Sequence, residues 1–486
     1  MTDTANPHHS RRWWILAILG IAQLMVVLDA TIVNIALPSA QDALGFSDDN
    51  RQWIVTAYAL AFGSLLLIGG RIGDLFGRRL VFVGGLIGFA VASALGGMAQ
   101  SFEVLVASRA LQGVFGALLA PAALSLLTTT FTDPSERGKA FGIFGAVAGA
   151  GGAVGLLLGG VLTEYLSWRF CLYVNLIFAV PAAIGGLALI ANQAHPAKPR
   201  LDLIGTALAT LGLFAVVFGF SQAETEGWGA TTTVGFLAAG VVLLVGFVAR
   251  QLHAEHPLLP MRVVLDRNRG GAYLAIGIAG MGMFGVFLFL TYYLQQTLGF
   301  SPVTTGLAFM PLALTVMVTA TTATAVLVPR FGPRPLVTLG MLLAALGMLL
   351  LTGVGTDTSY AAHVLPAIVV MGAGMGFIFA PAMSAATWGV AAHDAGIASA
   401  MVNVGQQVGG SIGTALLSTL SASAVSAFVV GKQATPDVAA QAAVHGYTTA
   451  FWWSAGIFLI GAVASALLFK RGVPEVDPAA EPVMAH

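Results

Sequence analysis

The sequence predicts an all-α polytopic membrane protein, and three observations support this fold class. Hydrophobic residues make up 57% of the 486 residues and charged residues only 9%, against roughly 25% charged residues in soluble chains. The mean hydropathy is +0.88. Apolar residues also fall in runs of about 20, the length that a helix needs to cross a bilayer, whereas an outer-membrane barrel would show alternating strands of about ten residues.

Fourteen apolar runs can be counted along the chain. Their centres lie near residues 25, 60, 88, 115, 150, 180, 211, 241, 282, 316, 343, 372, 410 and 460. Arginine and lysine collect in alternate connections between these runs and in both tails, which is typical of the cytoplasmic side of a membrane. We therefore expect a multi-pass protein of the inner, cytoplasmic membrane with both termini cytoplasmic. The first run lacks a small-residue cleavage site and is interpreted as a retained helix.

The composition also limits the functional classes. The net charge is zero, and no basic cluster or base-stacking motif indicates nucleic acid. We find no nucleotide-binding Gly-Lys-Ser/Thr loop, no intramembrane His pair for a metal and no activated Ser, so no enzyme, metal, cofactor or obligate protein partner is expected. Energy for transport would then come from an ion gradient. The four arginines between Arg250 and Arg269 are expected to contact anionic membrane lipid.

An internal repeat indicates how the spans are grouped. The segment from Glu136 through Gly155 reappears 258 residues later, from Asp394 through Gly413, so span five corresponds to span thirteen. Two helices must then be inserted between two six-helix halves. We expect an N-terminal six-helix bundle over residues 1–195, a linker with two accessory transmembrane helices over 196–262, a C-terminal six-helix bundle over 263–475 and a cytoplasmic tail over 476–486.

Asp29 lies in the middle of the first apolar run. An ionised carboxylate at that depth costs several kcal/mol, so it is expected to be protonated, paired across helices or in a water-filled cavity. Trp14 to Asp29 is about 22 Å of helix, and Arg109 lies about 9 Å below the outer end of span four, so their depths match. We hypothesise that the distance to Arg109 sets the proton affinity of Asp29. A fixed buried ion pair between spans one and four is the alternative.

A loop of glycines and charges connects spans two and three. Its residues are Gly70, Gly73, Asp74, Gly77, Arg78 and Arg79. The Asp74 carboxylate is expected at the start of span three, where unsatisfied N–H groups and the positive helix end favour an anion. The glycines permit a tight loop and close helix approach. We interpret this loop as an inner gate, with topological anchoring plus a helix cap as the alternative.

Span five is rich in glycines spaced three or four residues apart, which allow helices to pack closely in lipid. Those of the motif are Gly142, Gly151, Gly155, Gly159 and Gly160. Span thirteen has a similar series that includes Gly409 and Gly413. We expect the two spans to meet between the halves and form a surface that rocks or bends. Tight packing without motion is the alternative.

Polar and aromatic side chains within the spans are candidates for a central substrate cavity. They are Gln23, Asn34, Tyr58, Gln112, Tyr292, Tyr293, Asn403 and Gln407. Because no other acid lies at the depth of Asp29, the cavity is expected to favour small hydrophobic or bulky amphipathic compounds that are neutral or weakly charged. Helix packing is the alternative role for each of these residues.

Several of these segments resemble one known family. Gly70 to Arg79 resembles the signature loop of the major facilitator superfamily, and Arg109 to Gly113 resembles the span-four motif of its proton-coupled members. Leu28 to Pro38, the span-five glycines and the start of span six resemble motifs of the fourteen-helix drug:proton antiporters. The chain is identified as a member over nearly its whole length. This implies a major facilitator fold, with two six-helix bundles, two inserted helices and a cavity that opens to alternate sides.

Two positions depart from the family pattern. Leu156 stands where the antiporter motif has a proline that bends the helix, and the second copy of the signature loop, Pro329 to Arg334, has proline where Asp74 would align. The resemblance implies a proton-coupled antiporter that exports hydrophobic or amphipathic drugs or antibiotics, using protons and their gradient. A proton-coupled symporter of the same fold and a transport-inactive membrane sensor are the alternatives.

Overall fold

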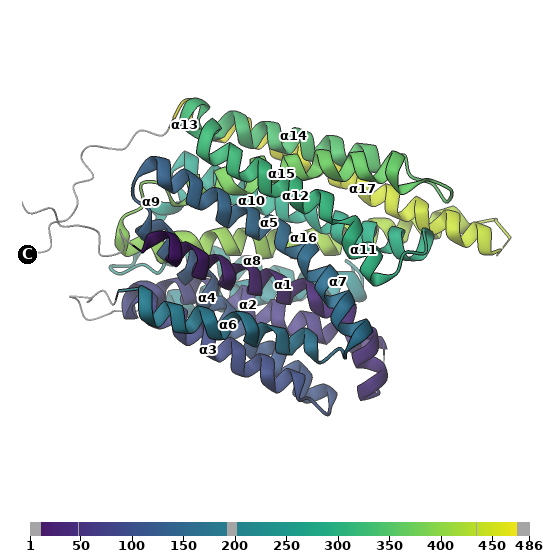
Figure 1. Cartoon of the computed structure of the whole chain (residues 1–486), viewed down its shortest axis with the longest axis horizontal. Helices are drawn as coiled ribbons and strands as arrows, with labels where there is room; N and C mark the ends of the chain where they lie inside the picture. Colours follow the sequence, from purple (N-terminus) through teal and green to yellow (C-terminus); the bar gives the residue numbers. More distant parts are fainter. Residues whose placement is uncertain (1–10, 47, 192–201, 434, 474–486) are drawn as a thin grey trace, which may run out of the picture.

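The computed structural model describes residues 11–46, 48–191, 202–433 and 435–473, and their regular elements are all helices (Figure 1). The first six are α1 (Arg12–Leu44), α2 (Asp48–Phe76), α3 (Arg78–Gly97), α4 (Phe102–Thr130), α5 (Pro134–Tyr165) and α6 (Phe170–Leu189). There follow α7 (Leu203–Thr225), α8 (Thr231–His253), α9 (Met261–Val264) and α10 (Arg267–Gly285). The others are η1 (Val286–Leu290), η2 (Tyr293–Thr297), α11 (Pro302–Ala308), α12 (Met310–Thr322), η3 (Ala323–Leu327), α13 (Val328–Phe331), α14 (Pro333–Leu351), η4 (Tyr360–Val364), α15 (Leu365–Thr387), η5 (Ala392–Asp394), α16 (Ala395–Val429) and α17 (Pro436–Leu468).

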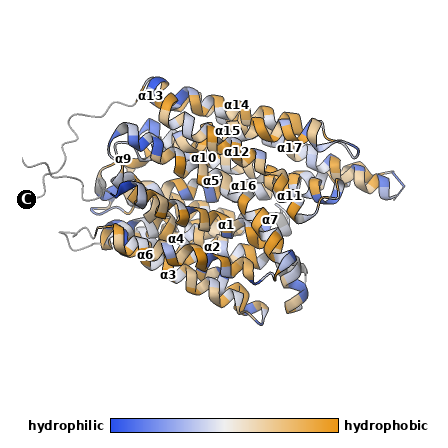
Figure 2. Cartoon of the chain, viewed as in Figure 1, coloured by the Kyte–Doolittle hydropathy of each residue, from blue (hydrophilic) through white to orange (hydrophobic). Residues whose placement is uncertain are grey.

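The number of membrane-spanning segments matches the prediction. Thirteen helical stretches of the described residues are long and apolar enough to cross a membrane, and α5, which is bent by 42°, makes fourteen. Hydrophobic residues follow the length of the helices (Figure 2). On α8, Val241, Val242 and Val245 are exposed, as side chains that face lipid are. The prediction of an all-α polytopic membrane protein is confirmed.

Helix starts follow local sequence signals. Asp133 accepts a hydrogen bond from the N–H of Glu136 (3.0 Å) at the start of α5, and Asp266 accepts from the N–H groups of Asn268 and Arg269 (both 3.0 Å) at the start of α10. Such side chains satisfy N–H groups that have no partner within the helix. Short polar segments therefore define where the long apolar helices begin.

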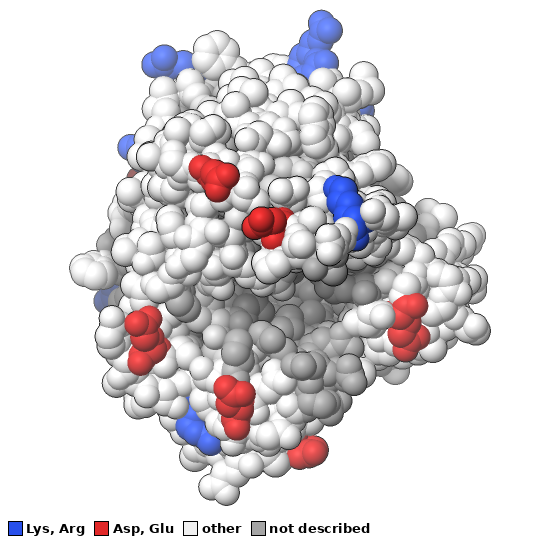
Figure 3. All heavy atoms as spheres, turned by 90° about the vertical axis from the view of Figure 1, so that its right-hand side faces the viewer, with Lys and Arg blue, Asp and Glu red and all other residues white. Residues whose placement is uncertain are grey.

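The two ends of the bundle differ in charge. We call the end at which α1 begins and α17 ends the terminal end, and the opposite end the distal end (Figure 1). At the terminal end Arg12 of α1 forms an ion pair with Glu136 of α5 (2.5 Å). On the distal face, acidic side chains are spread around a central hollow (Figure 3). Among the described residues, the exposed acids of the distal connections and helix ends include Asp42, Glu103, Glu164, Glu226, Asp357 and Asp437.

Helix packing follows the internal repeat. Gly151 of α5 faces Val27 of α1, and the residue 258 positions later, Gly409 of α16, faces Gly277 of α10. Across the molecule, α5 packs against α11, α12 and α15, whereas α16 packs against α2, α4 and α7. The prediction that the glycine-rich faces of spans five and thirteen meet each other is wrong, because each packs against the first helix of its own half.

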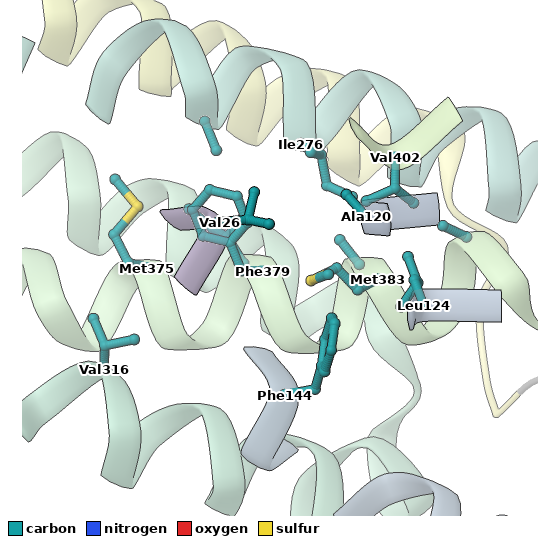
Figure 4. Packing of buried hydrophobic residues seen from close by; sticks show 14 of the residues in the cluster. Val26, Ala120, Leu124, Phe144, Ile276, Val316, Met375, Phe379, Met383 and Val402 are labelled. Carbon is teal, nitrogen blue, oxygen red and sulfur yellow. The ribbon is translucent and has the colours of Figure 1, made fainter. Parts of the chain in front are cut away.

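Apolar side chains from both parts of the chain share one core. Val26, Leu124 and Phe144 from the first six helices pack in the same cluster as Phe379 and Val402 (Figure 4). Burial of such side chains contributes about 1.5–3 kcal/mol each relative to exposure to water, although in lipid close packing provides most of the stabilisation. The halves are therefore in direct apolar contact in this conformation.

The α7–α8 hairpin lies over the seam between the halves. Ser221 and Trp228 connect it to both sides: Ser221 Oγ lies 3.3 Å from Thr56 Oγ1 of α2, and Trp228 Nε1 donates to Thr419 Oγ1 of α16 (3.0 Å). The predicted boundary at residue 195 and the predicted tail over 476–486 lie outside the described residues, and the predicted boundary at residue 262 falls within α9. The division into bundles and linker stays a prediction.

Asp202 holds the terminal end of this hairpin together. Its carboxylate accepts from the N–H of Gly205 (3.0 Å), from Gln251 Nε2 (3.0 Å) and from Arg250 Nε (3.4 Å). Burial pushes the pKa of Asp202 up, but the hydrogen bonds from Gly205 and Gln251 and the Arg250 guanidinium outweigh burial and hold this pKa below its ordinary value. The carboxylate is therefore stabilised in its ionised form.

Candidate functional site

Asp29 is the centre of a buried polar network formed by the first six helices. Its Oδ2 accepts a hydrogen bond from Arg109 Nη1 of α4 (2.7 Å). Its Oδ1 accepts from Gln112 Nε2 of α4 (2.9 Å) and from Asn175 Nδ2 of α6 (2.7 Å). The Asp29 side chain has no exposed surface. Within the described residues, the three hydrogen-bond partners of this carboxylate are all donors.

Arg109 makes further contacts besides the ion pair with Asp29. Its Nε donates to the Ile54 carbonyl of α2 (3.3 Å) and its Nη1 also donates to Gln112 Oε1 (2.8 Å). The guanidinium carbon lies 4.5 Å from the centre of the Tyr58 ring, a cation–π contact that gains strength where water is excluded. Arg109 is only 1% exposed. The pair of one acid and one base is neutral as a whole, which is how charges persist at membrane depth.

Two members of this network are absent from the predicted sites. Ser93 of α3 accepts from Gln112 Nε2 (2.7 Å) and from Asn175 Nδ2 (3.2 Å), so the network joins α1, α3, α4 and α6. Asn175 belongs to the segment that resembles the start of span six in the antiporter family, and that resemblance was the available signal. Nothing in the sequence around Ser93 distinguishes it from other serines in apolar helices.

A small cavity lies beside Arg109. It measures about 10 Å³ and, apart from Arg109, its lining is mostly apolar, with Val33, Ile54 and Leu172 among the wall residues. A cavity of this size holds about one water molecule, and a water needs polar partners. Beside Arg109 there is therefore room for about one water molecule, with the guanidinium as its polar neighbour.

The predicted cavity residues of the first half fall in different surroundings. Gln112 is fully buried in the Asp29 network, and Tyr58, 5% exposed, packs over Arg109 and stacks on Phe62 with ring centres 5.5 Å apart. Gln23 on α1 is also buried. The side chain of Asn34 lies outside the described residues. In this conformation Tyr58 and Gln112 support the charge pair.

The predicted cavity residues of the second half also lie in different surroundings. Tyr293 is fully buried, and its hydroxyl donates to the Gly355 carbonyl (2.8 Å), whereas Tyr292 is 41% exposed. Asn403 and Gln407 lie one turn apart on α16 and are half-buried. Asn403 Nδ2 donates to the carbonyl of Ser399 (3.0 Å). Asn403 and Gln407 lie on α16, which packs against α2 and α4 of the opposite half.

The span-five glycines place α5 directly behind Asp29. A Cβ on Gly155 would collide with Thr31 Oγ1 and lie 3.2 Å from the Leu28 carbonyl oxygen, and one on Gly159 would lie 2.9 Å from Ile32. On the other side, a Cβ on Gly145 would lie 2.7 Å from Ala380 of α15. Gly142 faces Thr324 of η3 in the same way, and Gly160 is buried. Hence α5 contacts both the helix of Asp29 and the opposite half.

The bend of α5 occurs without the family's proline. The axes of segments 135–152 and 154–165 differ by 42°, and Leu156 itself is buried. Gly151 and Gly152 lie immediately before the bend, and paired small residues are a recognised cause of helix kinks. The bend therefore coincides with the paired glycines.

The signature loop lies at the terminal end, where it connects the halves. Asp74 is in the last turn of α2, so its predicted position at the start of span three is wrong. Its carboxylate instead accepts from the N–H groups of Gly396 (3.0 Å) and Ile397 (3.2 Å) in the first turn of α16. Arg78 Nη2 donates to the same carboxylate (3.0 Å). Free N–H groups and the positive end of α16 provide the stabilisation that was assigned to span three.

The other loop residues have distinct roles. Gly77 has φ of 103°, a conformation that favours glycine, and it begins α3. A Cβ on Gly70 would lie 2.6 Å from the Gly396 carbonyl oxygen, so Gly70 permits α2 to approach α16, whereas Gly73 has open space around it. Arg79 Nη2 donates to the Leu187 carbonyl at the end of α6 (2.7 Å).

Arg137 forms a second connection between the halves, and it is absent from the predicted sites. Its guanidinium donates to the Thr128 carbonyl near the end of α4 (3.3 Å), to Thr387 Oγ1 (2.8 Å) and to the Ser384 carbonyl (3.5 Å) near the end of α15. The Phe141 ring centre lies 4.5 Å from the guanidinium carbon. Arg137 thus interacts with the negative ends of two helices that correspond in the repeat. From the sequence it was counted only as a basic loop residue.

Two packed helical halves, a buried charge pair and a charged connection at one end define a membrane transporter. The chain belongs to the Major Facilitator Superfamily, whose family model matches residues 19–414. The resemblance stated from the sequence is confirmed.

Several named proteins are similar to this chain over most of its length. The chain is 51% identical over 469 residues to the puromycin resistance protein pur8 of Streptomyces alboniger, covering 96% of this chain and 93% of that protein. It is 39% identical over 414 residues to the cephamycin export protein CmcT of Amycolatopsis lactamdurans, covering 85% of each. The multidrug efflux pump LfrA of Mycolicibacterium smegmatis is 32% identical, with coverage of 86% and 82%. These relatives are resistance and export proteins.

Solved structures support the fold. The human organic anion transporter MFSD10 superposes with a TM-score of 0.64 at 15% identity, covering 94% of this chain and 99% of that one. The proton:xylose symporter XylE gives a TM-score of 0.63 at 14% identity, covering 94% and 95%. At these identities the likeness concerns the fold alone.

Proposed function

We propose that the protein is a proton-coupled antiporter that exports hydrophobic or amphipathic antibiotics across the cytoplasmic membrane by alternating access. The observation that supports this most directly is the Asp29 network. Asp29 is an intramembrane acid with three donors aimed at it and no exposed surface. A proton on this carboxylate would remove the counter-charge of Arg109 and turn an oxygen that now only accepts into a donor, so the charge-assisted hydrogen bonds to α4 and α6 would weaken.

Weaker hydrogen bonds from Asp29 would let α1 move relative to α4 and α6. Because α5 packs on α1 near Asp29 and on α15 of the opposite half, a shift of α1 would reach the interface between the halves. Withdrawal of Arg109 would in turn favour the neutral acid. Proton binding and the relative position of the halves would then depend on each other, which is the requirement for coupling.

We propose that the terminal end is cytoplasmic. The arginines of this end are numerous, and they include Arg11, Arg12, Arg71, Arg78, Arg79, Arg137, Arg262, Arg267, Arg330 and Arg334. Basic residues favour the cytoplasmic side. With Asp74 and Arg137 connecting the halves at that end, this conformation would be closed toward the cytoplasm.

The names of the relatives support export rather than uptake. Pur8 is a puromycin resistance protein and CmcT a cephamycin export protein. Puromycin is therefore the first compound to test, together with lipophilic dyes.

The test uses proteoliposomes with an imposed pH gradient. Gradient-dependent transport of puromycin or a dye by the wild type, with loss in Asp29→Asn, is expected. Substrate moving in the same direction as protons would indicate the symporter. Absence of movement of any compound in either direction would favour the transport-inactive sensor.

A further inference from the structure

A second site of convergent charge lies at the terminal end, outside the network of Asp29. It is a cavity of about 380 Å³ between the start of α10, the start of α14 and the end of α17. Four cationic side chains line it: Arg267, Arg334, Lys470 and Arg471. They come from three segments far apart in sequence, so the fold, rather than one basic run, brings them together.

The walls of this cavity are fixed by backbone contacts. Arg267 Nη2 donates to the Leu467 carbonyl (2.7 Å), and the N–H of Lys470 donates to Asn268 Oδ1 (2.9 Å). Gly332, before α14, lies so close to the Gly472 carbonyl that a Cβ there would collide with it. The cavity is therefore a built feature of the fold.

The positive charge is only partly balanced. Lys470 Nζ lies 4.0 Å from Asp266 Oδ2. Within the described part of the chain, Arg334 and Arg471 make no hydrogen bond or ion pair. The N-terminal end of α14, which has no side-chain cap, adds partial positive charge. An anion in the cavity would supply the missing counter-charge.

The repeat explains why this cavity occurs in the second half. Gly77 and Gly332 correspond, since each has positive φ and begins a helix, α3 and α14. Arg334 then corresponds to Arg79, whose guanidinium donates to the last turn of α6. In the second half Arg267 occupies the equivalent carbonyl on α17. Among the described residues, Arg334 is thereby left without a hydrogen-bond or ion-pair partner.

We infer that this cavity binds the phosphate headgroup of an anionic membrane lipid. Its apolar wall includes Leu467, which is 66% exposed, and the nearby Phe331 is 57% exposed, so the cavity adjoins the lipid-facing surface. Arginine forks match phosphate oxygens, and basic pockets between helices on the cytoplasmic side bind anionic headgroups. The inference rests on the proposed cytoplasmic position of the terminal end. Basic residues that only anchor separate segments to the membrane surface would not line one shared cavity.

The test is lipid binding to the purified full chain, measured by native mass spectrometry with phosphatidylglycerol and with phosphatidylcholine of the same acyl chains. The wild type is expected to prefer phosphatidylglycerol. The double variant Arg334→Gln/Arg471→Gln should weaken that binding about 30-fold, from about 1 kcal/mol per arginine. The control Arg11→Gln/Arg330→Gln removes two charges that do not line the cavity and should bind as the wild type does.

Equal binding of both lipids, or equal loss in the control, would overturn the inference. Displacement of the lipid by millimolar inorganic phosphate would overturn the lipid assignment in favour of a soluble phosphate. A full-chain variant with Glu475, Asp477 and Glu481 neutralised tests the acidic tail as occupant. Lipid binding seen only in that variant would also overturn the inference. Because the readout is binding, failure here leaves the transport proposal standing, and the reverse holds as well.

Discussion

The pairing of Asp29 with Arg109 gives the sharpest test of proton coupling, through a double-mutant cycle. In Asp29→Asn the single amide oxygen would replace two carboxylate oxygens that now accept three hydrogen bonds at 2.7–2.9 Å. At least one bond would be lost, and Arg109, 1% exposed, would keep its charge without a counter-charge. Breaking a buried pair in this way costs about 3–5 kcal/mol, so Asp29→Asn should be strongly destabilised.

The double variant Asp29→Asn/Arg109→Gln removes both charges together. Its loss of stability should be smaller than the sum of the single losses by about 2–3 kcal/mol, the upper range for residues in contact. Unfolding free energies of the detergent-solubilised protein measure this difference. The control cycle uses Arg12→Gln and Glu136→Gln, whose partly exposed ion pair should show coupling below about 1 kcal/mol.

Transport separates the two interpretations of the pair. If Asp29 carries the proton, the double variant should recover stability without recovering gradient-driven export. If the pair only holds α1 and α4 together, the double variant should export at close to the wild-type rate under the same pH gradient. Export by the double variant at close to the wild-type rate would refute the role of this pair in proton coupling. A pairwise interaction energy below about 0.5 kcal/mol in the mutant cycle would refute the conclusion that the pair stabilises the fold.

Four further predictions follow from the geometry. Asp74→Asn should slow export roughly tenfold, since a hydrogen bond to a charged group contributes about 1.5–3 kcal/mol; an unchanged initial rate would contradict the connection. Arg137→Gln should broaden the distribution of distances between spin labels at the ends of α4 and α15. An unaltered distribution would contradict a role of Arg137 in connecting the halves. Gly155→Ala should lower the melting temperature through collision with α1, whereas Gly20→Ala, with open space at its Cβ, should not. Asp202→Asn should be less stable than the wild type at pH 7, because a depressed pKa stabilises the fold above the ordinary value of 3.8, and this gap should close as the pH falls below that value; a gap independent of pH would contradict the assignment.

Much of the Asp29 site could be predicted from the sequence. The matching depths of Asp29 and Arg109 follow from the helical rise alone, and Gln112 lies one turn from Arg109. Asn175 and Ser93 could not be assigned in the same way. A neutral polar residue in an apolar helix packs acceptably in many surroundings, so only the tertiary arrangement shows which of them faces a charge.

The incorrect predictions have a common physical cause. Asp74 was assigned to the nearest helix start in sequence, but helix α2 continues through it and the N–H groups it binds belong to α16, more than 300 residues later. The span-five glycines were expected to face span thirteen, yet they face α1, α15 and η3. In both cases the local preference was identified correctly and the partner was not, because local sequence does not specify which distant helix supplies it.

The position of α5 explains how one helix can serve both proposed roles. Gly155 and Gly159 pack on α1, close to Asp29, while Gly142 and Gly145 pack on the opposite half, nearer the terminal end. The 42° bend lies between these two groups. A change in this bend angle would move the segment that packs on the opposite half relative to the segment that packs on α1. The glycine motif therefore combines close packing with a bend, and because Leu156 is not a proline, its backbone N–H can keep the helix hydrogen bonded through that bend.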